Sequence, residues 1–124
     1  MLNILAESVF VKENYSVQSC VISLDNGFLI LITDQENFGI GNVILSSPPT
    51  IEGVKAISAP APLFGLSLKR DTLSKMISEL SAKKMKKPCL VLFHIKGMER
   101  KDLFISKCVV ESVKKVLDIA LDKM

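Results

Sequence analysis

The side chains best suited to chemistry in this chain are a single histidine and three cysteines. His94 lies inside the apolar segment Leu90–Ile95, with no acid or nucleophile close to it in the sequence. General base catalysis needs such a neighbour, and a zinc site commonly needs further histidines or paired cysteines. We therefore expect His94 to be a hydrogen-bonded residue of the core or of an interface, and we expect no catalytic or metal-binding site.

The three cysteines, Cys20, Cys89 and Cys108, lie far apart in apolar runs and show no CxxC spacing. Their odd number argues against a disulfide framework. Free cysteines are among the most buried residues, and disulfides are rare in the reducing cytoplasm. The pattern therefore predicts three buried free thiols in a cytoplasmic protein.

Gly39-Ile40-Gly41 is a further short motif, because glycine-rich loops can bind phosphate. It lacks a third glycine, a following helix and a Gly-Lys-Ser/Thr sequence, so it predicts a bend or bulge. The nearby carboxylates of Asp34 and Glu36 lie in a predicted turn and are expected to be solvated. These residues predict no cofactor and no enzymatic activity.

The chain has 124 residues, of which 48% are hydrophobic, and a mean hydropathy of +0.36. This length predicts one domain, residues 1–124. The longest apolar runs, Phe28–Ile32 and Cys89–Phe93, fall far short of the roughly 20 residues of a membrane-spanning helix, so we expect no membrane insertion. Met1-Leu2-Asn3-Ile4 does not resemble a signal peptide. The apolar surplus is therefore expected in the core and in an interface, which favours an obligate dimer.

The net charge of +3 conceals an asymmetry along the chain. Residues 1–60 carry two lysines and six acidic residues, a net charge of −4, which leaves +7 for residues 61–124. The densest basic run is Lys83-Lys84-Met85-Lys86-Lys87, at the end of a predicted helix. Such a run is often a solvated helix cap. Because no aromatic residues alternate with these lysines, the binding alternative is an acidic protein surface rather than nucleic acid.

Strand patterns fill the first half of the chain, and the second strand is expected to turn into the third at Asn26-Gly27. This dipeptide is typical of a type I′ hairpin, which needs two residues with positive φ. The segment Phe28–Thr33 is apolar on both faces, so we place it centrally in the sheet. The expected strands are residues 4–12, 15–24, 28–33, 40–45 and, as a short edge strand, 54–58.

Two helices and two further strands are expected in the second half. Asp71 or Ser67 can cap a helix that runs to about Lys84. Its apolar stripe of Leu73, Met76, Ile77 and Leu80 predicts a core face, which leaves Ser74, Lys75, Ser78 and Glu79 facing water. Strands are expected at Cys89–Ile95 and Asp102–Ser106, followed by a final helix over residues 107–122.

The predicted fold class is therefore α+β. We expect a single antiparallel β-sheet of about six strands with two flanking helices that lie against one face. The order of elements is β-β-β-β-(β)-α-β-β-α. This arrangement offers protein-binding surfaces rather than a catalytic centre.

With this order of elements, the sequence resembles the small proteasome assembly chaperones. These are the third and fourth members of the eukaryotic set, with their yeast and archaeal-type relatives. The resemblance runs from about Val17 to Val116. It rests on the hairpin Cys20–Leu24/Phe28–Thr33, on Phe38-Gly39 before a strand that ends in Ser-Pro, on the triplet Leu63-Phe64-Gly65, on the strand Cys89–Ile95 and on the amphipathic C-terminal helix.

The resemblance implies a non-catalytic chaperone that dimerises, with itself or with a related small chaperone, and binds α-type proteasome subunits during assembly of the 20S core ring. The larger assembly chaperones end in a hydrophobic-Tyr-X tail, which this chain lacks. We take as candidate contact residues the four lysines of the basic run and two phenylalanines as apolar anchors. They are Lys83, Lys84, Lys86, Lys87, Phe38 and Phe64.

Two other interpretations stay open. One is a roadblock or longin-like scaffold module that regulates a GTPase, although roadblock chains begin with a helix where residues 4–12 here predict a strand. The other is a small nucleic-acid-binding domain, whose binding would depend steeply on salt.

Overall fold

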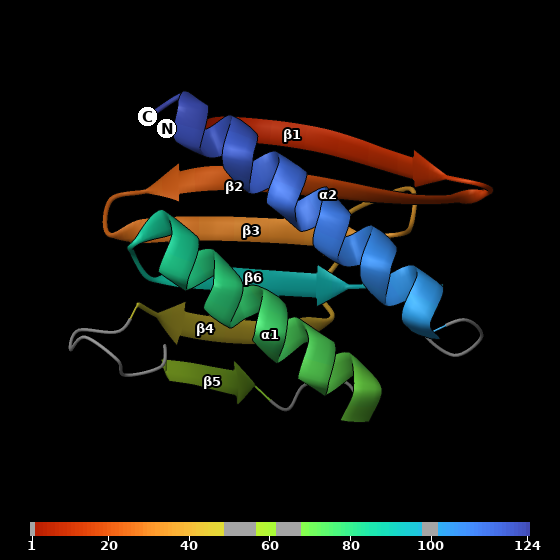
Figure 1. The fold of residues 1–124 in the computed structure, drawn as a ribbon. Coiled ribbons are helices and arrows are strands. Elements are labelled where there is room, and N and C mark those ends of the chain that lie inside the picture. The colour runs from red at the N-terminus through yellow and green to blue at the C-terminus, as the bar shows by residue number, and fades with distance from the viewer. Residues whose placement is uncertain (1, 49–56, 62–67, 98–101) are drawn as a thin grey trace.

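A computed structural model of the chain describes residues 2–48, 57–61, 68–97 and 102–124. Within these ranges the chain forms six strands and two helices, which confirms the α+β class (Figure 1). The elements are β1 Asn3–Lys12, β2 Tyr15–Leu24, β3 Gly27–Thr33, β4 Asn42–Ser47, β5 Ile57–Ala61, α1 Leu68–Met85, β6 Cys89–His94 and α2 Asp102–Asp122.

The described strands form one sheet in the order β1-β2-β3-β6-β4-β5. Neighbouring strands are antiparallel except β3 and β6, which are parallel, so the expectation of a purely antiparallel sheet is wrong for this pair. A parallel neighbour requires a long connection that returns the chain to the same end of the sheet. Here β4, β5 and α1 lie between β3 and β6 in the chain, and together they make that return.

The β2–β3 hairpin forms, but Asn26-Gly27 is not its turn. Leu24 pairs with Gly27, so the two loop residues are Asp25 and Asn26, and neither has positive φ. Gly27 serves a different purpose, because a Cβ there would lie 2.3 Å from the carbonyl oxygen of Pro88. The next amide, Phe28 N–H, donates to that carbonyl at 2.9 Å. The glycine therefore lets the start of β6 approach β3.

Several boundaries differ from expectation. Residues 102–106 belong to α2 and do not form a strand: Ile105 is buried while Leu103 is 70% exposed, a pattern that a helix also produces. The edge strand lies at Ile57–Ala61 rather than 54–58, of which 54–56 fall outside the described residues. Helix α1 begins at Leu68, before the expected cap Asp71, and the other candidate cap, Ser67, is outside the described residues.

Both helices lie side by side on one face of the sheet, as expected (Figure 1). Helix α2 covers β1 and β2, while α1 covers β4, β5 and β6. Alternate residues of the central strands point into this layer and are fully buried, among them Ile30, Ile32, Val91 and Phe93. The core of the described part of the chain is therefore the space between the helices and this one face.

The face that α1 turns to the sheet differs from the predicted stripe. Leu73 and Ile77 are buried as expected, but Met76 is 49% exposed. Ser74 and Ser78, expected to face water, are completely buried. The expectation treated serine as a surface residue, but a serine hydroxyl can be buried when it finds a hydrogen-bond partner.

Those partners lie on β4. Asn42 donates its Nδ2–H to Ser74 Oγ at 3.1 Å, and the hydroxyls of Ser46 and Ser78 are hydrogen-bonded at 2.5 Å. These contacts need short side chains, which allow the helix backbone to approach the strand. The polar seam between α1 and β4 therefore turns the helix so that Met76 points outward.

Asp34, directly after β3, is hydrogen-bonded to residues at the ends of β2 and β6. Its carboxylate accepts hydrogen bonds from Tyr15 Oη–H at 3.0 Å, from Gln35 Nε2–H at 2.9 Å, and from the backbone N–H groups of Lys96 at 2.9 Å and Gly97 at 2.8 Å. The expectation of a solvated carboxylate is therefore wrong. Partial burial raises the pKa of Asp34, but the donors, with Lys96 N–H first, outweigh it and hold the pKa below its ordinary value.

Replacing this carboxylate should cost stability. Asp34→Asn brings an amide N–H₂ into a site built from donors, and we expect a loss of roughly 1–3 kcal/mol in the free energy of unfolding. Because the folded-state pKa is lowered, the stabilisation is present above the unfolded pKa of about 3.9 and is lost as the pH falls through the folded value. Urea unfolding at pH 7 and at decreasing pH should show the two proteins converging in acid.

Glu36→Gln is the matched control, since Glu36 is an exposed carboxylate two residues away. It should leave stability unchanged at pH 7. A similar loss for both variants would mean that the hydrogen bonds of Asp34 contribute nothing specific.

Candidate interaction surfaces

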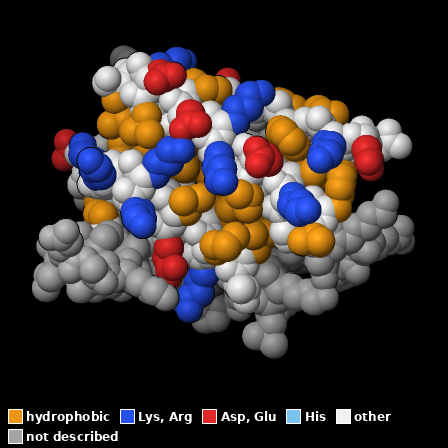
Figure 2. Space-filling view, viewed as in Figure 1, with side chains coloured by type: hydrophobic (Ala, Val, Ile, Leu, Met, Phe, Trp, Pro, Cys, Tyr) orange, Lys and Arg blue, Asp and Glu red, His pale blue; other side chains and the backbone are white. Residues whose placement is uncertain are grey.

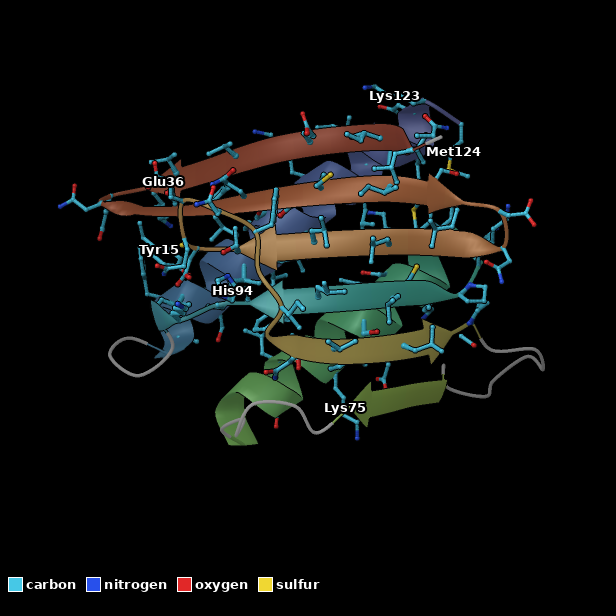
Figure 3. All side chains as sticks on the ribbon, turned by 180° about the vertical axis from the view of Figure 1, so that it is seen from behind. Tyr15, Glu36, Lys75, His94, Lys123 and Met124 are labelled. Carbon is cyan, nitrogen blue, oxygen red and sulfur yellow. The ribbon has the colours of Figure 1, made fainter. Side chains whose placement is uncertain are left out.

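The face of the sheet opposite the helices is apolar at its centre. Leu29 and Leu31 of β3 alternate with the buried core residues and stand in register with Leu90 and Leu92 of β6. All four are only half-buried, and no described helix covers them (Figure 3). They form two cross-strand leucine pairs in the middle of the sheet.

The same apolar face continues outward onto the neighbouring strands. Register places every second residue of β1, β2 and β4 on it, and several of these side chains are strongly exposed, such as Val11 at 64% and Leu45 at 48%. We name as the sheet face the apolar side chains of Ile4, Val9, Val11, Ile22, Leu24, Leu29, Leu31, Val43, Leu45, Leu90 and Leu92. The same face also carries Glu7 and Gln18 and, at its crossed end, Thr33 and His94, so the apolar patch is centred on the four leucines. An exposed apolar patch is typical of an interaction site.

The size of this face fits a stable interface. The five strands that carry it, at about 4.8 Å spacing, measure about 19 Å across, and seven residues at about 3.3 Å extend about 23 Å. The flat projection is therefore roughly 440 Å². Side-chain relief raises the accessible area above this projection, toward the ~800 Å² that each partner of a standard protein interface buries.

One end of the sheet face is crossed by residues 34–41, which lead from β3 past β6 to β4 (Figure 3). Two glycines permit the crossing: a Cβ at Gly39 would lie 2.8 Å from the His94 ring, and one at Gly41 would lie 2.3 Å from the Phe93 carbonyl oxygen. His94 Nδ1 is hydrogen-bonded to Thr33 Oγ1 at 2.9 Å, which confirms the expected hydrogen-bonded histidine. Gly39-Ile40-Gly41 is a chain crossing and holds no phosphate loop.

The crossing segment adds apolar side chains beside the sheet face. Phe38 is 39% exposed and Ile40 is 59% exposed. The candidate anchor Phe38 therefore belongs with the sheet face rather than with the lysines. The second candidate anchor, Phe64, lies outside the described residues.

The four candidate lysines at the end of α1 differ in their contacts. Lys84 Nζ lies 2.6 Å from a carboxylate oxygen of Asp118 on α2. Lys86 has a φ of 60°, and its N–H donates to the Ala82 carbonyl, which ends α1.

The ammonium of Lys87 lies 5.9 Å from the centre of the Phe28 ring, within the range of a cation–π contact. Lys83, by contrast, is exposed on α1, and no described contact holds its side chain. Three of the four lysines thus help to shape the end of α1, and Lys83 is the one most available to a partner.

The charge asymmetry along the sequence appears in the fold as a difference in net charge between the sheet and the helices. Residues 2–48, which build β1 to β4, carry one lysine and five acidic residues. Residues 72–87 and 103–123, which include the described side chains of both helices, carry nine lysines and four acidic residues. Figure 2 shows these lysines spread over the helix-bearing side of the molecule.

No three His, Cys, Asp or Glu side chains of the described residues gather as a metal site would require. A hollow of about 570 Å³ between β1 and α2 is lined by Phe10, Lys12, Ser106, Lys107, Val110 and Glu111. It contains no histidine or cysteine. Neither described helix is long and apolar enough to span a membrane.

No family model matches this sequence, and no curated protein sequence matches it. The fold is similar to that of a chain in a crystal structure described as a novel chaperone complex for yeast 20S proteasome assembly. The alignment covers 94% of this chain and 98% of that chain, with a TM-score of 0.64 and 9% sequence identity. At this identity the likeness establishes a shared fold over almost the whole of both chains.

The three cysteines should be unreactive while the protein is folded. All are buried and free, and burial raises the pKa of each thiol, that of Cys89 to about 12. At pH 8 the thiolate fraction of Cys89 is then about 10⁻⁴. Alkylation should be slow in buffer and rapid at all three positions in denaturant, with mass spectrometry counting the adducts. Rapid modification of the native protein would contradict the burial.

Proposed function

We propose that this chain is a non-catalytic chaperone of the cytoplasm that pairs through its sheet face and binds α-type proteasome subunits while the 20S core ring assembles. The observation that carries the proposal is the sheet face itself: a broad surface, left uncovered by both described helices, whose centre is apolar. The fold likeness to a chain of a proteasome assembly chaperone complex supports the choice of partner.

The sheet face suits pairing with a second copy or with a related chain of the same fold. Its leucine side chains carry no groups that need hydrogen-bond partners. Two such faces can therefore pack together as the two layers of a β-sandwich do. Exposed apolar area of this size in water is unfavourable by about 25 cal/mol per Å². The strand at Asn3–Lys12 also agrees with the chaperone-type order of elements rather than with the helix-first order of roadblock modules.

In this proposal the chaperone acts by occupying a surface of its subunit and not by catalysing a reaction. A dimer that holds one surface of an α-type subunit prevents wrong associations there, and it leaves when later subunits require the same surface. The division of charge between the layers sets the orientation and the association rate of that encounter more than its affinity.

Pairing through the sheet face predicts that Leu92→Lys yields a folded monomer. An unpaired ammonium in the middle of the interface should weaken dimerisation by roughly 3 kcal/mol or more, which is over a hundredfold in the dissociation constant. Sedimentation equilibrium measures the mass, and circular dichroism checks the fold. Met76→Lys, on the helix-bearing side, is the control and should remain dimeric. A Leu92→Lys protein that is still dimeric would remove the sheet face from the proposal.

Binding to α-type subunits is tested by native mass spectrometry of this protein mixed with α-type proteasome subunits from the same source. We expect a defined complex that is absent from mature 20S particles. Folded dimer and competent subunits that form no complex would contradict the proposed function. Binding of single- or double-stranded oligonucleotides with a steep salt dependence would favour the nucleic-acid alternative instead.

A further inference from the structure

The outward side of the two helices carries an exposed apolar centre that the fold does not use. Met76 on α1 is 49% exposed, and Leu80, one turn further along, is half-buried. Figure 2 shows hydrophobic side chains gathered in the middle of this side of the molecule, with lysines around them. Methionine is flexible and polarisable, which suits it to contact a partner surface of varied shape.

Lysines flank this centre on both helices. Lys75 and Lys83 are exposed on α1, and Lys114 and Lys115 are exposed on α2. Lys84 of this region forms an ion pair with Asp118, which links α1 to α2.

We name the exposed side chains of Lys75, Met76, Lys83, Lys114 and Lys115 the helix surface. We propose that the helix surface docks an acidic protein surface with an apolar recess for Met76. The inference rests on the proposed function only in naming an α-type subunit as the protein that carries this acidic surface.

Charge complementarity selects this occupant. The helix layer is basic and the sheet layer acidic, so a partner with negative charge is attracted to the helices and repelled from the strands. A second copy bound to the apolar sheet face leaves the helix surface of each protomer open. A nucleic acid is the less suitable occupant, because the described part of the chain places no exposed aromatic ring on either helix to stack with bases.

The test compares binding of α-type subunits to Lys75→Glu/Lys83→Glu and to Met76→Glu by surface plasmon resonance at several salt concentrations. Reversing two flanking lysines should lower the association rate about tenfold at low salt and flatten its salt dependence. Met76→Glu should mainly accelerate dissociation. Lys12→Glu/Lys96→Glu is the matched control, with the same change of net charge at exposed lysines outside the helix surface, and it should bind like the wild type.

Equal binding by all four proteins would overturn the inference and leave the proposed function intact. If the wild type binds no α-type subunit, the proposed function fails, and a photo-crosslinking residue at position 76 then decides the inference in cells of the source organism. Cross-links mapped to an acidic protein surface, absent from a control crosslinker at position 24, would support it. Cross-links to nucleic acid, or equal labelling from both positions, would overturn it.

Discussion

The rest of the structure depends on burial of one face of the sheet beneath two helices. The central strands β3 and β6 are apolar on both faces, but the two helices cover a single face. Ile30 and Val91 are completely buried on that side, whereas Leu31 and Leu92 stand on the other side with partial exposure. The hydrophobic effect therefore stabilises the folded chain through one face of these strands and leaves the apolar side chains of the other face partly exposed. In the proposed function, the same strands serve both folding and association.

Insertion of β6 between β3 and β4 imposes the second constraint. The chain that leaves β3 must pass the end of β6 to reach β4, and glycines at 39 and 41 allow this crossing at van der Waals distance. Asp34 holds the start of the crossing through four donors, two of them backbone amides just after β6. The crossing also brings Phe38 and Ile40 beside the sheet face. The connection that leads the chain from β3 to β4 therefore also enlarges the apolar surface.

Much of the fold follows from local sequence, and the failures have physical causes. Alternation and turn residues predict the first three strands, and the two-sided apolar character of Phe28–Thr33 and Cys89–Ile95 predicts the centre of the sheet. Because two helices on one side cover only one face, the same two-sided apolar character also indicates an apolar face that stays uncovered. It does not say which face that is. Burial of Ser74 and exposure of Met76 depend on partners 32 residues away on β4, which periodicity does not detect. The short run Leu103–Ile105 fits a strand or a helix equally well.

In the proposed function, the separation of apolar and charged surfaces affects how the bound subunit is released. An interface of leucines on the sheet face changes little with ionic strength, whereas attraction between the lysines of the helix layer and an acidic partner is screened beyond about 8–10 Å at physiological salt. In the proposed function, the pairing contact is therefore long-lived and the subunit contact is fast and reversible. This division would suit a chaperone that binds an assembling subunit and later leaves it. Placing the two contacts on opposite sides of the sheet lets each be formed without disturbing the other.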